Sequence, residues 1–307
     1  TLTATDNTSQ CTASSTVTVT VQNTLPTVDA GSNATITCSN QNTALILGTA
    51  AISGLTYAWS PTTGLNDYTI AQPTATPTTS TNYTLTVTNP QTGCVATDNV
   101  LVNVNTTAPP INVGTPFTKT CVNFLNGTTI GSPGINGLTY LWSPATGLSS
   151  ATIGQPNANP TATTTYTLVV NNPTNGCSST GQVTVTVNQV PPVANAGNDA
   201  SITCTQISPI QLGTTAVSGY GYAWTPSTNL SANNIANPIA NPTVTTTYTL
   251  TVTDINNGCT ASDPVIVTVN NTTPVVTANV LGNQTTVCAG SSITLYGSGG
   301  ANTYAWS

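Results

Sequence analysis

The stretch YAWSP at residues 57–61 decides the fold of this chain, because the sequence repeats it almost unchanged. It recurs as YLWSP at 140–144, as YAWTP at 222–226 and as YAWS at 304–307. The four tryptophans in these stretches are spaced by 83, 82 and 82 residues. A constant period of this length is typical of small domains joined in tandem, which usually serve as spacers, scaffolds or adhesive stalks.

Other motifs recur with the same period and indicate where each repeat begins and ends. They are a tyrosine-containing run, a Gly-Cys turn and a proline-containing linker, first seen as NYTLTVT at 82–88, TGC at 92–94 and LPT at 25–27. Proline linkers of this kind separate domains. We therefore predict complete repeats at 27–105, 110–188 and 192–270, the C-terminal hairpin of a truncated repeat at 1–22, and the N-terminal part of another at 275–307. The chain looks like a window from a longer protein.

Apolar residues alternate with Thr or Asn in runs such as TVTVTV at 16–21 and VTVTV at 183–187, which predicts half-buried antiparallel strands. In the first complete repeat we predict seven strands, near 28–30, 34–37, 43–49, 55–60, 68–71, 82–89 and 98–104. Seven short strands in about 80 residues indicate a β-sandwich, so the chain is predicted to be all-β. The predicted core residues are Trp59, Trp142, Trp224, Trp306, Tyr83, Tyr166 and Tyr248, with further contributions from Leu65, Leu148, Leu230, Ile70, Ile153 and Ile235.

The motifs together resemble a known group of repeats. The segment from Ala30-Gly31 to Ile36-Thr37-Cys38, then YAWSP, the run TTTYTLTVT at 245–253 and the turn NGC at 257–259 are similar to immunoglobulin-like, polycystic-kidney-disease-type repeats of Bacteroidota surface proteins. These include gliding-motility adhesins and other cargo of the type IX secretion system. The resemblance implies a tandem array of seven-stranded immunoglobulin-like sandwiches, export, an extracellular cell-surface or filamentous location, and cell adhesion. WSP replaces the acidic segment that follows the Trp in better-known members, so no calcium-binding role carries over.

Eight cysteines occupy two fixed places in the repeats. With no His and no CxxC pair, disulfide bonds are favoured over a metal site. The two places are predicted to lie at opposite ends of a sandwich, about 20–25 Å apart, whereas a disulfide needs Cα atoms within about 7 Å. We therefore prefer bonds between neighbouring repeats, Cys38–Cys177 and Cys121–Cys259, with Cys11, Cys94, Cys204 and Cys288 pairing outside the sequence. Bonds within each repeat remain the open alternative: Cys38–Cys94, Cys121–Cys177 and Cys204–Cys259.

Only 3 % of the residues are charged, and the single basic residue is Lys119. Nucleic-acid binding is not expected, because neutralising phosphates requires Lys and Arg. No apolar run approaches the roughly 20 residues of a membrane helix, so membrane insertion is not expected either. The seven acidic residues are all Asp, and with no His, Glu or Arg the sequence offers no general acid or base beside a nucleophile. We predict no catalytic residue, no metal site and no cofactor, and assign the Asp residues to turns and strand edges.

These observations favour a structural role over a catalytic one. We predict an extracellular, disulfide-reinforced stalk of a surface adhesin or filament. Its expected partners are neighbouring repeats of the same chain, other copies of the chain in a filament, and an extracellular surface or glycan. One alternative is an array of carbohydrate-binding modules, using exposed aromatic residues such as Tyr68, Tyr220 and Tyr296. Another is a spacer in a secreted hydrolase, and a third is ice binding by threonine ladders.

Overall fold

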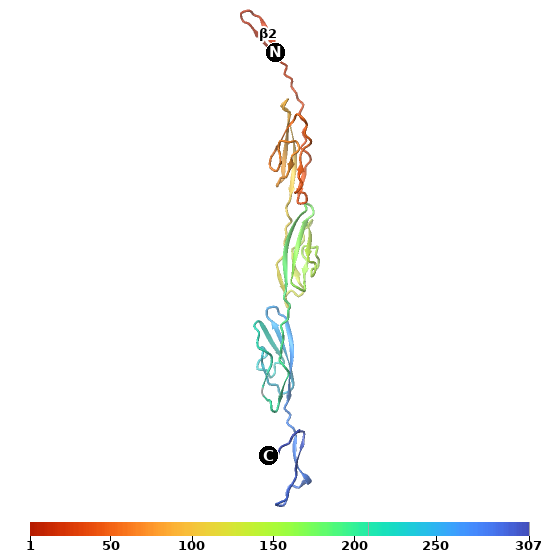
Figure 1. The fold of residues 1–307 in the computed structure, drawn as a ribbon, viewed down its shortest axis with the longest axis vertical. Helices are drawn as coiled ribbons and strands as arrows, with labels where there is room; N and C mark the ends of the chain where they lie inside the picture. Colours follow the sequence, from red (N-terminus) through yellow and green to blue (C-terminus); the bar gives the residue numbers. More distant parts are fainter. Residues whose placement is uncertain (208, 307) are drawn as a thin grey trace. The chain divides into compact units, whose positions relative to one another are not determined.

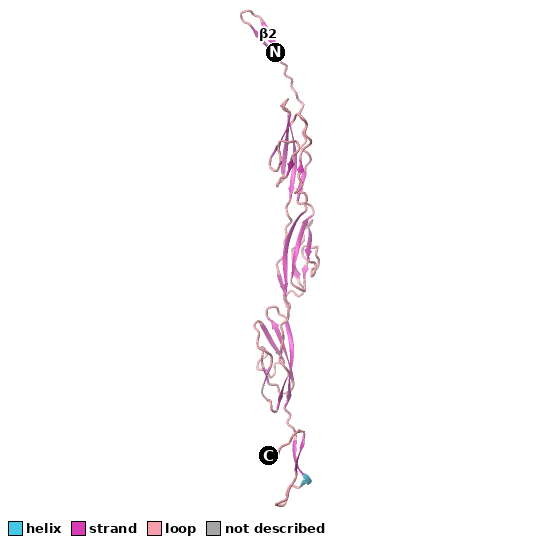
Figure 2. Ribbon diagram, in the orientation of Figure 1, coloured by secondary structure: helices cyan, strands magenta, loops and turns pink. Residues whose placement is uncertain are grey.

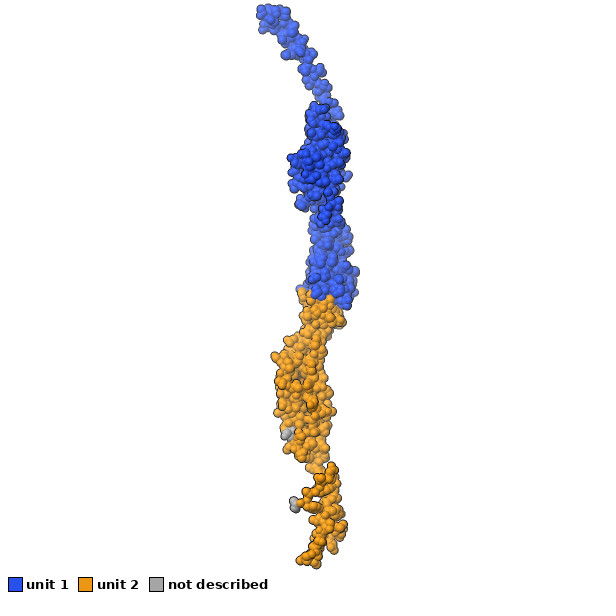
Figure 3. All heavy atoms as spheres, in the orientation of Figure 1, with its two compact units in different colours: residues 1–115, 129–158, 165–183 blue, residues 116–128, 159–164, 184–307 orange. Residues whose placement is uncertain are grey.

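The computed structural model describes residues 1–207 and 209–306, and it consists of strands joined by loops (Figure 1). The one helical element in these ranges is a 3₁₀ turn, η1 (Leu281–Asn283) (Figure 2). The chain divides into two compact units (Figure 3). They comprise residues 1–115, 129–158 and 165–183, and residues 116–128, 159–164 and 184–307.

Six strands form the first complete repeat, and they lie in two sheets. The strands are β3 (Ala34–Thr37), β4 (Leu45–Ile46), β5 (Thr56–Ser60), β6 (Thr74–Ala75), β7 (Thr81–Thr88) and β8 (Val95–Asn105). One sheet has the order β3-β8-β7-β5, with β3 parallel to β8 and the other pairs antiparallel, and the second sheet pairs β4 with β6. Side chains of both sheets meet in one core. This is the arrangement of an immunoglobulin-like sandwich, in which the third, second-last and last strands share a sheet.

The third complete repeat has the same topology. Its strands are β15 (Ala200–Thr203), β16 (Ile210–Gln211), β17 (Tyr220–Thr225), β18 (Ile239–Ala240), β19 (Thr246–Asp254) and β20 (Thr260–Asn270), in the orders β15-β20-β19-β17 and β16-β18. The second repeat has elements at matching places in the sequence: β9 (Phe117–Lys119), β10 (Thr128–Thr129), β11 (Thr139–Ser143), β12 (Asn157–Ala158), β13 (Thr164–Asn172) and β14 (Cys177–Val187). There β11 pairs antiparallel with β13, and β9 pairs parallel with β14. The prediction of an all-β tandem array of immunoglobulin-like sandwiches is confirmed.

Two of the seven strands predicted for the first repeat are not strands in the structure. Residues 28–30 run as extended chain, held by a bond from the Ala30 N–H to the Asp98 carboxylate (2.8 Å) and by one from the Gly48 N–H to the Ala30 carbonyl (2.9 Å). Residues 68–71 form turns, and the short strand β6 comes a few residues later. The Asp98 bond recurs in the third repeat between Asp263 and Ala196 (2.8 Å), so these two Asp residues act at a strand edge.

Each complete repeat is built around its tryptophan. Trp59, Trp142 and Trp224 are 1–2 % exposed, and Tyr83, Tyr166 and Tyr248 are fully buried. The indole Nε1–H of each Trp donates a hydrogen bond to the carbonyl of an Ile eleven residues later, at 2.9–3.0 Å. These Ile side chains, of Ile70, Ile153 and Ile235, are 39–46 % exposed, so the prediction that they fill the core is wrong. Their backbone carbonyls satisfy the indole, and their side chains belong to neither core cluster, whereas Leu65 and Leu230 do pack against the core.

The buried tyrosines are expected to make the fold less stable at alkaline pH. Burial raises the pKa of Tyr83 and Tyr248, partly opposed by hydrogen bonds from Thr81 and Thr246. The protonated phenol is therefore favoured in the fold, and its stabilising effect is complete below the unfolded-state pKa of about 10. We expect the urea midpoint of unfolding to stay flat from pH 6 to pH 9 and to fall as the pH rises through the folded-state pKa. Tyr248→Phe should reduce that fall; a midpoint that already drops between pH 6 and pH 9 would contradict this assignment.

The two outer segments contain one hairpin each. β1 (Leu2–Thr5) pairs with β2 (Thr12–Ser15), and β21 (Val276–Val280) pairs with β22 (Leu295–Gly299). The run TVTVTV at 16–21 is not a strand, and Val17, Val19 and Val21 are 78–81 % exposed. In the complete repeats the matching residues lie in the last strand, between two neighbouring strands. The alternation in 16–21 thus marks a sequence suited to a strand whose partners are missing among the described residues.

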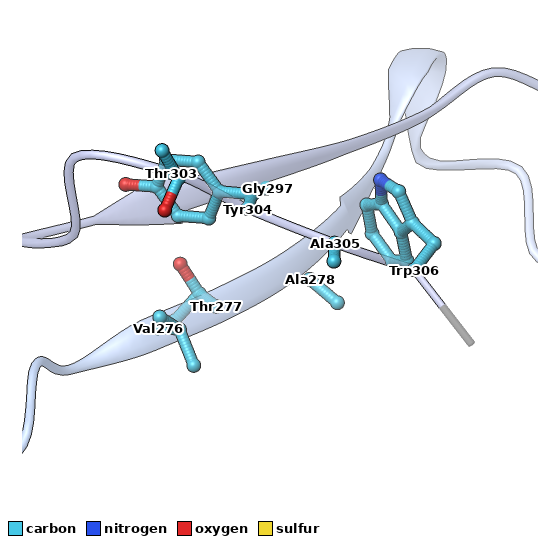
Figure 4. Close-up of a pocket in the computed structure, with 8 residues that line it drawn as sticks. All are labelled: Val276, Thr277, Ala278, Gly297, Thr303, Tyr304, Ala305 and Trp306. Atoms are coloured by element: carbon cyan, nitrogen blue, oxygen red, sulfur yellow. The ribbon is translucent and has the colours of Figure 1, made fainter. Parts of the chain in front are cut away.

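Trp306 was predicted to be a core residue, and this prediction is wrong for the described residues. Its side chain is 55 % exposed. It lies at one end of a cleft lined by β21 and β22, together with Val276, Ala278 and Tyr304 (Figure 4). In the complete repeats the Trp is covered by the strand that follows it, as Trp59 is by Leu85 of β7. Among residues 275–306, β21 pairs only with β22, and no strand covers Trp306 in this way.

Candidate functional site at the junctions between repeats

Two disulfide bonds join places that belong to different predicted repeats. Cys38 follows β3 of the first repeat, and Cys177 is the first residue of β14 in the second. They form a disulfide with a Cα–Cα distance of 5.0 Å across a sequence separation of 139 residues. Cys121 follows β9 of the second repeat, and Cys259 directly precedes β20 of the third. They form an equivalent bond, also with a Cα–Cα distance of 5.0 Å, across 138 residues.

These are the two bonds that the sequence analysis preferred over pairs within a repeat. The other four cysteines, Cys11, Cys94, Cys204 and Cys288, form no disulfide with any described residue. Cys204 occupies in the third repeat the place that Cys38 and Cys121 occupy in the first two. Pairing of these four with residues outside the sequence stays a prediction.

A buried asparagine holds the first junction beside its disulfide. Asn175 is 2 % exposed, and its Nδ2 donates to the Asn105 Oδ1 (3.1 Å), at the end of the first repeat, and to the Thr107 carbonyl (3.0 Å), in the linker that follows. The Asn175 Oδ1 accepts from the N–H of Cys177, and its carbonyl accepts from the N–H of Cys38, each at 3.0 Å. One residue thereby contacts both cysteines and the linker, so all its polar groups except the N–H have partners in the junction.

The second junction repeats this arrangement. Asn257, also 2 % exposed, donates from Nδ2 to the Asn188 Oδ1 (3.1 Å) and the Val190 carbonyl (3.0 Å). Its Oδ1 accepts from the Cys259 N–H (2.8 Å), and its carbonyl accepts from the Cys121 N–H (3.1 Å). We call Asn175 and Asn257, with these bonds, the asparagine clamps. Because buried polar groups are costly when unpaired, the clamps favour one docked geometry over others.

The clamps were not predicted from the sequence. The signal that could have identified them is the turn itself, which reads Asn-Gly-Cys at 175–177 and at 257–259 but Thr-Gly-Cys at 92–94. The acceptors recur too, as Asn105 and Asn188. In a chain rich in Asn, this recurrence is hard to separate from background. At the first turn, the Thr92 Oγ1 accepts a long bond from the Cys94 N–H (3.3 Å), and a threonine has no amide that could form the clamp.

The glycine between the clamp and the cysteine lies against the neighbouring repeat. Gly258 has φ of +70°, and a Cβ added there would lie 2.6 and 2.7 Å from the two γ-carbons of Val122. Gly93 has almost the same φ, +71°, with nothing within 4 Å. A residue with a side chain would therefore strain the backbone equally at both positions, but only at position 258 would its Cβ also clash with Val122.

We expect Gly258→Ala to weaken the second junction and Gly93→Ala to leave it unchanged. Overpacking typically destabilises a folded contact by about 1–3 kcal/mol. A tenfold change in an equilibrium constant corresponds to about 1.4 kcal/mol. The equilibrium constant for forming Cys121–Cys259 in a glutathione buffer should therefore fall by about 5- to 150-fold. Alkylation and mass spectrometry of the two thiols measure this constant. Equal effects of the two alanines would show that backbone strain, and not the contact with Val122, explains the requirement for Gly.

The single basic residue is part of a core and not of a charged surface. Lys119 is 7 % exposed and occupies the place of the buried Ile36 and Ile202 in the other complete repeats. Its Nζ donates to the Asn159 Oδ1 (2.5 Å) and to the Pro160 carbonyl (3.3 Å). The ammonium group thus reaches oxygen acceptors at the edge of the core, while its carbon chain replaces the Ile side chain.

No other constellation in the described residues suggests chemistry. Residues 1–207 and 209–306 contain no cluster of His, Cys, Asp or Glu able to hold a metal ion. In the same ranges, no helix is long and apolar enough to cross a membrane. Tyr68 and Tyr296 are about half exposed and Tyr220 lies in β17, and the complete repeats do not share an aromatic residue at any of these places.

No protein-family description matches the chain, and no curated protein sequence does. Solved structures resemble it at low identity. Titin domains I67–I69, in an E-to-A variant, match with a TM-score of 0.43 and 10 % identity, over 79 % of this chain and 98 % of that one. Extracellular cadherin domains 1–4 of protocadherin gamma B7 match with a TM-score of 0.42 and 10 % identity, over 88 % and 84 %. Drosophila N-cadherin EC1–4 matches with a TM-score of 0.33 and 11 % identity, over 74 % and 70 %.

Proposed function

We propose that the chain is an extracellular structural region of a surface adhesin or filament, acting as a disulfide-reinforced stalk. The observation that carries the proposal is the bond from Cys38, beside β3 of the first repeat, to Cys177 in β14 of the second, with its counterpart Cys121–Cys259. Disulfides persist in oxidising compartments such as the cell exterior. A protein that has to hold its repeats at fixed spacing gains from bonds that join one repeat to the next.

The finer parts of the proposal rest on the sequence. The resemblance to repeats of Bacteroidota surface proteins supports cell-surface attachment, export by the type IX secretion system and a role in adhesion or gliding motility. We propose the repeat limits 27–105, 110–188 and 192–270, so that each asparagine clamp and its side-chain acceptor, Asn105 or Asn188, belong to neighbouring repeats. The proposed partners are neighbouring repeats of the same chain, other copies of the chain in a filament, and an extracellular surface or glycan.

An experiment on intact cells of the source organism tests the proposal. Antibodies raised against the purified chain should label the surface of unpermeabilised cells, and external proteinase K should remove the signal. A membrane-impermeant maleimide should label Cys38, Cys121, Cys177 and Cys259 only after reduction. Labelling that requires permeabilised cells would contradict the extracellular location. Loss of labelling without loss of attachment in a deletion strain would contradict the adhesive role.

A further inference from the structure

The two disulfides close intervals of sequence that overlap. Cys38–Cys177 closes the interval from 38 to 177, and Cys121–Cys259 closes the interval from 121 to 259. The two intervals share residues 121–177, so together they cover the chain from Cys38 to Cys259 without a gap. Every peptide bond in that stretch is bypassed by at least one disulfide.

This overlap gives each linker a second covalent connection. The linker at 109–110 is bypassed by Cys38–Cys177, and the linker at 191–192 by Cys121–Cys259. Pairs within the repeats, Cys38–Cys94, Cys121–Cys177 and Cys204–Cys259, would have bypassed neither linker. The second covalent connection across each linker therefore depends on which cysteines are paired, and not on the number of disulfides.

We propose that the array is a covalently redundant tether, which stays whole and keeps bearing load after hydrolysis of any single peptide bond between Cys38 and Cys259. Hydrolysis adds water across the C–N bond and leaves a carboxylate and an amine, and it does not change either disulfide. The neighbouring repeats then remain joined through sulfur. This inference rests on the two disulfides and on no assumption about adhesion, so it goes beyond the stalk proposed above.

The exposure of the linkers explains why redundancy would matter. Thr107 and Ala108 in the first linker are exposed, as is Val190 in the second, at 73 %. Exposed segments between folded domains are preferred sites of proteolysis. By contrast, the single site for a trypsin-like protease in the sequence follows Lys119, which is buried. Between Cys38 and Cys259, the exposed peptide bonds beside Ala108 and Val190 are therefore bypassed by a disulfide, whereas the exposed segment at 16–21 is not.

The first junction also keeps both sides of a cut linker docked. The Thr107 carbonyl, before a cut at Ala108, accepts from the Nδ2 of Asn175 in the second repeat. The Pro109 carbonyl, after the cut, accepts from the Ser179 hydroxyl of the same repeat (2.6 Å). The disulfide thus has to replace only the covalent connection, because these bonds keep the repeats in contact.

The single tryptic site allows a direct test on the full chain. The free thiols are first blocked with iodoacetamide, and the protein is then digested with trypsin in dilute urea without reductant. We expect cleavage after Lys119 to leave one species on a non-reducing gel, and reduction to release residues 1–119 and 120–307. Fragments that separate without reductant would overturn the inference, because Cys38–Cys177 is the bond that bypasses this site.

Matched variants make the test reciprocal. Cys38→Ser with Cys177→Ser should let the tryptic fragments separate without reductant, whereas Cys121→Ser with Cys259→Ser should not. Lys119→Ile with Gln189→Lys moves the single site into the second linker, and there the two cysteine pairs should exchange their effects. Any other pattern would contradict overlapping intervals.

Load is measured on the folded Lys119→Ile, Gln189→Lys protein after cleavage at the second linker. Held by its ends in optical tweezers, the cut tether should survive forces that break it once reductant is added. Rupture of the oxidised tether at the same force as the Cys121→Ser, Cys259→Ser form would overturn the proposal that the bypass bears load.

Discussion

Trp224→Ala is expected to lower the free energy of unfolding of the third repeat by about 3–5 kcal/mol. The side chain is 1 % exposed and belongs to the core cluster formed with Leu212, Tyr248 and Leu250. Removal would leave a cavity between the two sheets and also an unpaired carbonyl at Ile235, which now accepts the indole N–H at 2.9 Å. Because each repeat has a small core, a loss of this size is a large part of its total stability.

The chain offers its own control, since Trp306 lies in the same sequence motif but is 55 % exposed. We expect Trp306→Ala to change stability by no more than about 0.5 kcal/mol. Hydrogen exchange of the β19 amides in the full chain, followed through a urea titration, reports the third repeat separately from the others. Equal losses in the two variants would mean that burial of Trp224 is not what stabilises the repeat.

Asn257→Ala is expected to weaken the second junction by about 2–4 kcal/mol, because it removes three side-chain bonds at once. The Asn188 Oδ1, the Val190 carbonyl and the Cys259 N–H would all lose their partner within the junction. The equilibrium constant for forming Cys121–Cys259 should therefore fall by about 30- to 700-fold. This is measured in glutathione buffers by alkylation and mass spectrometry.

Thr92→Ala is the matched control, because Thr92 holds the same place in a turn without a clamp. It should leave the constant for Cys121–Cys259 unchanged. Asn257→Asp separates the two kinds of bond at nearly constant side-chain shape. The carboxylate can still accept from the Cys259 N–H, but it cannot donate to the Asn188 Oδ1 or the Val190 carbonyl. If Asn257→Ala leaves the disulfide equilibrium within twofold of the unchanged chain, the clamp does not stabilise the junction.

Much of the fold could be predicted because the motifs that indicate it recur several times in the sequence. A tryptophan that recurs every 82 or 83 residues, between alternating strands, indicates a repeated core, and Trp59, Trp142 and Trp224 lie in such cores. The error at Ile70, Ile153 and Ile235 has a physical cause. An apolar side chain at a recurring place suggests burial, but here the recurring partner of the indole is the backbone carbonyl, and the Ile residue itself stays 39–46 % exposed.

The junctions were only partly predictable. Strand lengths and the reach of a disulfide indicated which cysteines could meet, because these are general distances. The clamps depend on the rotamer of a single Asn and on which carbonyl of the linker it faces, and neither follows from residue type. Lys119 illustrates the same limit: one basic residue in a nearly uncharged chain suggests a surface group, yet it takes the place of a core Ile.

Both disulfide-bonded junctions use the same few parts at the same places, namely a cysteine after the first strand and an Asn-Gly-Cys turn before the last. A cysteine and a turn of the same sequence therefore meet at both junctions. A gene with such a period can gain or lose one unit by recombination between equivalent codons, and each new junction would again bring these parts together. Selection can in this way change the length of the chain in steps of one unit without having to invent a new contact.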